Sequence, residues 1–389
     1  MGDTTELRIE KPSHGVEVFE RDDPEAVLSR AAWLLTLGNR CQELFYPALQ
    51  DAAPGVQRAP EPPDDEEDAD REVLGIPRLE GKLEGGGRRT IQDRYGLESG
   101  DAGRGRLVEL AHQVSRTRDP YDALALFECG VGSPDALTRV ASAIAYGRWT
   151  VLPVFIPLLA EVVEGATPQL LEPDGDEADM AATLARNELA RIAPDHPALS
   201  PFLHEVTPAG GSPSHTSLLV HGTWARFAKW WQPGVGTFHD YLLGNHVPDL
   251  YAASDRYEWS GGYSDHARAM AAVQLDGWLA AHTIARLARL VAHSHGGNVA
   301  MMATHGTTQA DQLVLLSCPV HRSKYLPNFG NVGEVVSFQV HMDLVVLADG
   351  GRLKFRHPQI RDETIPLWFK HDASHDEDVW DRYRLADRL

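Results

Sequence analysis

A serine between two histidines is the feature of this sequence best suited to chemistry. Residues 290–302 read LVAHSHGGNVAMM, in which an apolar run typical of a buried strand ends at Ser294 and a packed helix is predicted after two glycines. A sharp turn from strand to helix raises its central side chain above the sheet edge, near helix N–H groups that lack intrahelical partners. Small residues at Ala292 and Gly296 fit the close packing that such a turn requires. The pattern favours a nucleophile, and a plain helix N-cap is the alternative.

A serine hydroxyl needs a base to remove its proton, and two later residues could complete that arrangement. Asp343 and His375 each follow a predicted strand, which gives the order nucleophile, acid, base along the chain. Asp349 is an alternative acid, but Asp343 lies closer to its strand end. His371 is an alternative base, but His375 stands directly before the acidic stretch that opens the last predicted helix.

The stretch AHSHGG resembles the nucleophile elbow of serine hydrolases of the α/β-hydrolase superfamily, particularly bacterial lipase-like members, with Ala292 where Gly is common. The resemblance covers residues 214–389. It implies a serine esterase that cleaves a carboxylic ester of a small molecule or lipid through an acyl-enzyme on Ser294, with His375 as base, Asp343 as orienting acid and no cofactor. An acyltransferase or thioesterase would use the same triad.

The resemblance also assigns roles around the first predicted strand of this region, which ends in HGTW. It implies that the backbone N–H of Thr223 or Trp224 pairs with that of His295 to form an oxyanion hole. It places further residues against the substrate: His221, Gly222, His293 and Trp259. The alternatives are an ordinary turn and, for the aromatic residues, core packing.

Metal chemistry is the less favoured reading of the histidines. His371 and His375 stand four residues apart, so on a helix they could form a metal pair. The carboxylates of residues 64–68 lack the alternating spacing and the turn glycine of a calcium loop. We therefore expect no metal.

Composition narrows the class of protein. The 389 residues carry a net charge of −20, which disfavours nucleic acid as a partner. The three cysteines lack metal-ligand spacing and no secretory signal is visible at the start, so we expect a cytoplasmic protein. The apolar run at 151–163 is too short for a membrane span.

The chain is expected to fold as two domains. Asp23-Pro24, Asp119-Pro120 and Pro134-Asp135 begin amphipathic helices, which predicts a mainly α-helical domain over 1–205 with an acidic, Pro-rich loop at 53–72. Residues 206–215 would be a linker, followed by an α/β-hydrolase domain over 216–389. Its sheet would be mostly parallel, with about six strands and helices on both faces. The six candidates are SLLVHG, DLYAAS, ARLVAHS, QLVLLSC, VVSFQV and TIPLWF.

The helical half supports a different class of function. It could be an interaction or regulatory module with a protein partner, fused to a hydrolase-like scaffold that has little or no catalytic activity. The motifs of residues 214–389 favour the enzyme.

Overall fold

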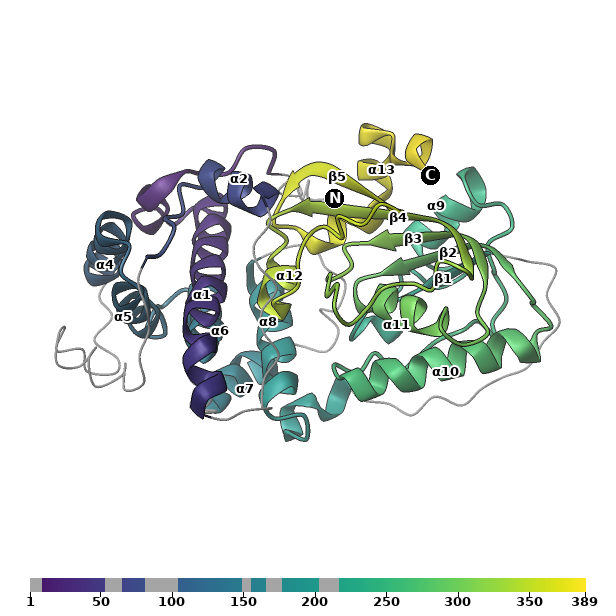
Figure 1. Cartoon of the computed structure of the whole chain (residues 1–389), viewed down its shortest axis with the longest axis horizontal. Helices are drawn as coiled ribbons and strands as arrows, with labels where there is room; N and C mark the ends of the chain where they lie inside the picture. The colour runs from purple at the N-terminus through teal and green to yellow at the C-terminus, as the bar shows by residue number, and fades with distance from the viewer. Residues whose placement is uncertain (1–8, 53–64, 81–103, 149–154, 166–176, 203–216) are drawn as a thin grey trace. The chain divides into compact units, whose positions relative to one another are not determined.

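The computed structural model describes six stretches of the chain: 9–52, 65–80, 104–148, 155–165, 177–202 and 217–389 (Figure 1). The chain divides into two compact units. The first comprises Met1–Ala166, Gly175–Ala193 and Leu347–Gly350. The second comprises Thr167–Asp174, Pro194–Val346 and Gly351–Leu389. The expected linker at 206–215 lies outside the described residues.

The first unit is helical wherever its residues are described, apart from short connections. Its elements are η1 (Gly15–Phe19), α1 (Pro24–Ala52), α2 (Asp65–Val73), α4 (Arg104–Thr117), α5 (Pro120–Gly130), α6 (Ala136–Gly147), α7 (Ile156–Gly165) and α8 (Glu177–Ile192). The predicted helix starts are confirmed. Asp119 caps α5 by accepting the Tyr121 N–H at 2.9 Å, and Asp135 caps α6 by accepting the Thr138 N–H at 2.9 Å.

The acidic segment differs from the expected loop. Residues 65–73 form α2, whereas residues 53–64 lie outside the described residues. Glu, Ala and Arg are good helix formers, and carboxylates in the first turn are stabilised by the positive end of the helix dipole. The consecutive acidic residues of this segment are therefore compatible with a helix.

The second unit is built on a parallel sheet. Its strands are β1 (Ser217–Val220), β2 (Leu287–His293), β3 (Ala310–Leu316), β4 (Val332–His341) and β5 (Ile360–Trp368). They lie in the order β1-β2-β3-β4-β5, and every neighbouring pair is parallel. The sheet has five strands in the described residues, not about six, because the candidate at 249–254 forms only one bridge, from Leu250 to Ser217.

Helices pack on both faces of this sheet. The helices after residue 194 are η3 (Pro197–Phe202), η4 (Ala225–Phe227), α9 (Thr237–Asn245), α10 (Asp265–Ala281), α11 (His295–Ala303), α12 (Leu344–Asp349), η5 (His371–His375), α13 (Glu377–Tyr383) and η6 (Leu385–Arg388). The last residues of α12, from Leu347, belong to the first unit. The connection from β1 to β2 contains both α9 and α10, which pack on opposite faces of the sheet. Helices α10 and α11 lie below the sheet in Figure 1, and α9 and α13 lie on the other side.

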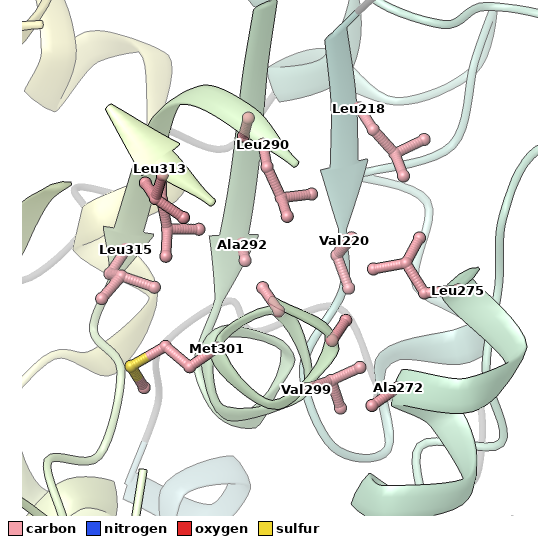
Figure 2. Packing of buried hydrophobic residues seen from close by; sticks show 14 of the residues in the cluster. Leu218, Val220, Ala272, Leu275, Leu290, Ala292, Val299, Met301, Leu313 and Leu315 are labelled. Carbon is pink, nitrogen blue, oxygen red and sulfur yellow. The ribbon is translucent and has the colours of Figure 1, made fainter. Parts of the chain in front are cut away.

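The alternation of side chains along β2 sets up the site. Leu290 and Ala292 lie on the face of the sheet that α11 covers, in one hydrophobic cluster with Val299 (Figure 2). Val291 points to the opposite face, and His293 continues on that side because strand side chains alternate. The strand thus delivers His293 toward α9 and α13 and ends at Ser294. No helix within the described ranges is both long and apolar enough to cross a bilayer.

Candidate active site

Ser294 occupies the turn between β2 and α11 in a strained conformation. Its backbone has φ 53° and ψ −135°, which a non-glycine residue rarely adopts and which costs roughly 1–3 kcal/mol. Two backbone hydrogen bonds hold it, from Ser294 N–H to Leu316 at 2.8 Å and from Gly297 N–H to Ser294 at 2.9 Å. Strain of this kind concentrates at functional sites, so the turn is the first candidate for one.

Three glycines are required because the chain packs closely around this turn. A Cβ on Gly222 would stand 2.7 Å from the Ser294 Cβ. A Cβ on Gly296 would collide with the His221 carbonyl oxygen, and one on Gly297 would stand 2.6 Å from the Cys318 sulfur. Gly222 and Gly296 therefore permit the end of β1 to lie against the serine turn, and Gly297 permits α11 to approach Cys318 after β3.

Asp343 and His371 form a hydrogen-bonded pair past the ends of two adjacent strands. Asp343 follows β4 and is fully buried, and its Oδ2 lies 2.8 Å from the His371 Nδ1. The other carboxylate oxygen accepts the N–H groups of Val345 at 3.0 Å and Val346 at 3.2 Å, which fixes the carboxylate plane. A carboxylate only accepts, so Nδ1 donates and the neutral His371 keeps its lone pair on Nε2.

The pairing differs from the one expected at His375. That ring is buried and stacks on Trp230, with centroids 4.0 Å apart and planes 8° apart, and Asp343 bonds His371 instead. Burial, followed by the neighbouring His371, lowers the pKa of His375 to about 3. An imidazole this weakly basic is poorly suited to take a serine proton at neutral pH.

The expected oxyanion donors are placed in different ways. The Trp224 N–H donates to the Gly261 carbonyl at 3.0 Å and is therefore occupied. The Thr223 hydroxyl lies 3.0 Å from the His295 Nδ1, which ties the turn after β1 to the first residue of α11. His295 is the first residue of α11, so its N–H lacks an intrahelical partner and can serve as a donor next to Ser294.

His221 and Trp259 bind each other in the interior. Both are fully buried, and the Trp259 indole N–H donates to the His221 carbonyl at 2.8 Å. The His221 Nδ1 lies 2.8 Å from the Gly222 carbonyl, and its Nε2 accepts the Trp259 N–H at 3.4 Å. Burial lowers the pKa of His221 to about 3, so it is neutral. Both ring nitrogens are used inside the protein, which gives the pair a scaffold role.

His293 lies among the other site residues. Its ring centroid is 4.8 Å from that of His371, 4.5 Å from that of His375 and 5.2 Å from that of Trp230. Burial, followed by the neighbouring histidines, lowers the pKa of His293 well below its ordinary value. Trp230 belongs to an aromatic segment between the first two predicted strands, whose density suggests a pocket cover or core packing but does not single out this residue.

In the described part of the chain, no group of three or more His, Cys, Asp or Glu side chains is arranged to hold a metal ion. His371 and His375 lie at opposite ends of the short η5 helix, and the first of them is bonded to Asp343. The described residues thus hold a hydrogen-bonded pair, Asp343 and His371, after β4 and β5, and a strained serine turn after β2. No protein-family model, curated protein or solved structure matches the chain.

Proposed function

We propose that this protein is a serine hydrolase that cleaves carboxylic esters, with Ser294 as nucleophile, His371 as general base and Asp343 as the acid that orients the base. The observation that carries the proposal is the 2.8 Å bond between Asp343 and His371 at the sheet edge that also bears the strained Ser294 turn. Parallel strands bring their carboxyl ends to one edge, so residues from β2, β4 and β5 meet there.

The proposed reaction begins when the Ser294 hydroxyl oxygen attacks the ester carbonyl carbon and His371 Nε2 takes its proton. The oxyanion of the tetrahedral intermediate would accept hydrogen bonds from the Thr223 and His295 N–H groups. Collapse breaks the bond to the alcohol oxygen, which receives the proton from His371. Water then attacks the acyl-enzyme by the same sequence, which releases the acid and restores the serine.

His371 replaces His375 as the proposed base for two reasons. The carboxylate of Asp343 compensates the charge that His371 acquires, whereas His375 faces the Trp230 ring. The side chain of His371 also keeps 13% of its surface exposed, which a base that must reach substrate and water requires. His375 packs against the rings of Trp230 and His293.

Labelling with a fluorophosphonate probe tests the nucleophile. Wild-type protein should be labelled, Ser294→Ala should not, and His371→Ala should label far more slowly because its serine is not activated. Ser337→Ala, which removes a buried hydroxyl from β4, is the matched control and should label like wild type. A folded wild-type protein that is not labelled would refute the proposal. If the Ser294→Ala protein is still labelled, Ser294 is not the nucleophile.

The proposal extends to the class of the catalytic domain, a protein partner, the cellular location and the substrate. The parallel sheet with helices on both faces supports an α/β-hydrolase domain in the second unit, and the helices of the first unit could bind a protein partner. Cys41, Cys129 and Cys318 are buried thiols outside any disulfide, which supports action in the cytoplasm. A series of p-nitrophenyl esters beside matched thioesters would separate an esterase from a thioesterase by kcat/KM.

A further inference from the structure

The nucleophile and the proposed base come from separate strands, so something must fix the distance between them. Ser294 follows β2, and His371 follows β5, with β3 and β4 between these strands in the sheet. The bond to Asp343 restrains His371 at Nδ1 alone. A ring held at one atom can still pivot about that bond, so a second contact is needed to aim Nε2.

His293 makes that second contact. One peptide bond joins it to Ser294, so its ring is placed by the same turn that places the nucleophile. Its ring lies against the ring of His371 at 4.8 Å, with an interplanar angle of 59°. The His371 backbone also lies beside the His293 ring. His293 thus contacts both the ring and the backbone of the proposed base.

His293 is itself held from behind by two rings. His375 meets it edge-on, with centroids 4.5 Å apart and planes 86° apart, and Trp230 meets it at 5.2 Å and 78°. Trp230 and His375 are stacked on each other. In the described residues, neither ring nitrogen of His293 has a hydrogen bond of good geometry, although its side chain is buried.

Burial is the largest cause that lowers the pKa of His293, followed by the neighbouring rings of His375 and His371, so His293 stays neutral. Of these rings, His371 has the Asp343 carboxylate as its partner. The proton taken from Ser294 is therefore confined to His371.

We propose that His293 is a positioning residue, which fixes the His371 ring relative to Ser294 while Trp230 and His375 hold His293 in place. The proposal rests on the proposed serine hydrolase function. In this arrangement His293 neither gives nor takes a proton. It sets the geometry in which His371 can do so.

Two substitutions separate the ring contact from simple stability. His293→Ala removes the ring and should slow fluorophosphonate labelling and kcat on the order of 100-fold, the effect of a displacement near 1 Å, with little change in KM. His293→Phe keeps a ring of similar shape and should recover labelling to within roughly 10-fold of wild type. The NMR signal of the His371 Nδ1 proton should broaden or shift in His293→Ala and be retained in His293→Phe.

His239→Phe is the matched control, because His239 is a buried histidine of α9 whose Nε2 lies 3.0 Å from the Tyr251 carbonyl. It should lower the melting temperature and leave the labelling rate unchanged. If His293→Ala labels at the wild-type rate while Ser294→Ala stays unlabelled, the positioning role is refuted and the hydrolase survives. If Phe is as damaging as Ala in a folded protein, the ring contact is refuted as the cause. If wild type takes no label, both proposals fail.

Discussion

The substitution Asp343→Asn gives the sharpest test of the proposed acid and base pair, because the structure fixes which way the new amide must face. One carboxylate oxygen accepts two backbone N–H groups, from Val345 and Val346, and only an oxygen can take that place. The amide NH₂ is therefore directed at the His371 Nδ1, 2.8 Å away in the wild type. Two donors cannot face each other, so His371 must move its proton to Nε2 and offer its lone pair to the amide.

That tautomer cannot accept the serine proton, because its basic nitrogen points away from Ser294. The same change in a Ser-His-Asp protease lowers kcat by about 10⁴-fold, which corresponds to about 5.4 kcal/mol. We expect a loss of this order in the steady-state hydrolysis of a p-nitrophenyl ester. The N-cap of α12 is retained, so the melting temperature should change little, whereas Asp343→Ala should also lose about 1 kcal/mol of stability.

Two outcomes would refute this reasoning. A folded Asp343→Asn protein with kcat within roughly 10-fold of wild type would show that His371 does not depend on Asp343 for its tautomer. A large fall in the melting temperature that accompanies the fall in kcat would show that the carboxylate stabilises the fold. The labelling rate should fall in parallel with kcat, because both reactions need the activated serine.

Further predictions concern the two histidines of η5 and the glycines. His371→Gln should lower kcat by about 10²–10⁴-fold as the general base is lost, whereas His375→Phe keeps the stack on Trp230 and should stay within about 10-fold of wild type by ester hydrolysis. The unfolded chain binds a proton at His375 near pH 6.5, and the folded chain only near pH 3, so stability falls as pH drops through this window. Urea unfolding of His375→Phe should show a shallower fall. Gly296→Ala should destabilise the protein and reduce labelling because its Cβ meets a backbone carbonyl, whereas Gly277→Ala on α10 has open space and should gain about 0.5–1 kcal/mol.

Local patterns in the sequence were sufficient to predict the elements that carry the site. Buried parallel strands read as continuous apolar runs, and five of the six candidate runs are the five strands of the sheet. The turn at Ser294 was also visible, because only small residues at its flanks allow a strand and a helix to meet so closely. The strands and the turn are each determined by residues that are adjacent in the sequence. The order of the strands then brings Asp343 to the same edge.

The choice between His371 and His375 depended on contacts that no local pattern contains. The sequence favoured His375 because it precedes Asp376, which caps α13 by accepting the Val379 N–H at 3.1 Å. That cap is real, but it fixes where the helix begins and not which imidazole meets the acid. The decisive contact is the stack of His375 on Trp230, which comes from the segment after β1.

The stack explains how a proposed catalytic histidine and a structural one can stand four residues apart in one short helix. An imidazole buried against aromatic rings loses hydration and stays neutral, so it contributes packing without competing for a proton. The imidazole beside a buried carboxylate can carry the charge that catalysis places on it. Exchanging the two environments would exchange the two roles. Trp230→Ala should therefore loosen His375 and His293 together, and a fall in the labelling rate matching that of His293→Ala would tie the tryptophan to the base through His293.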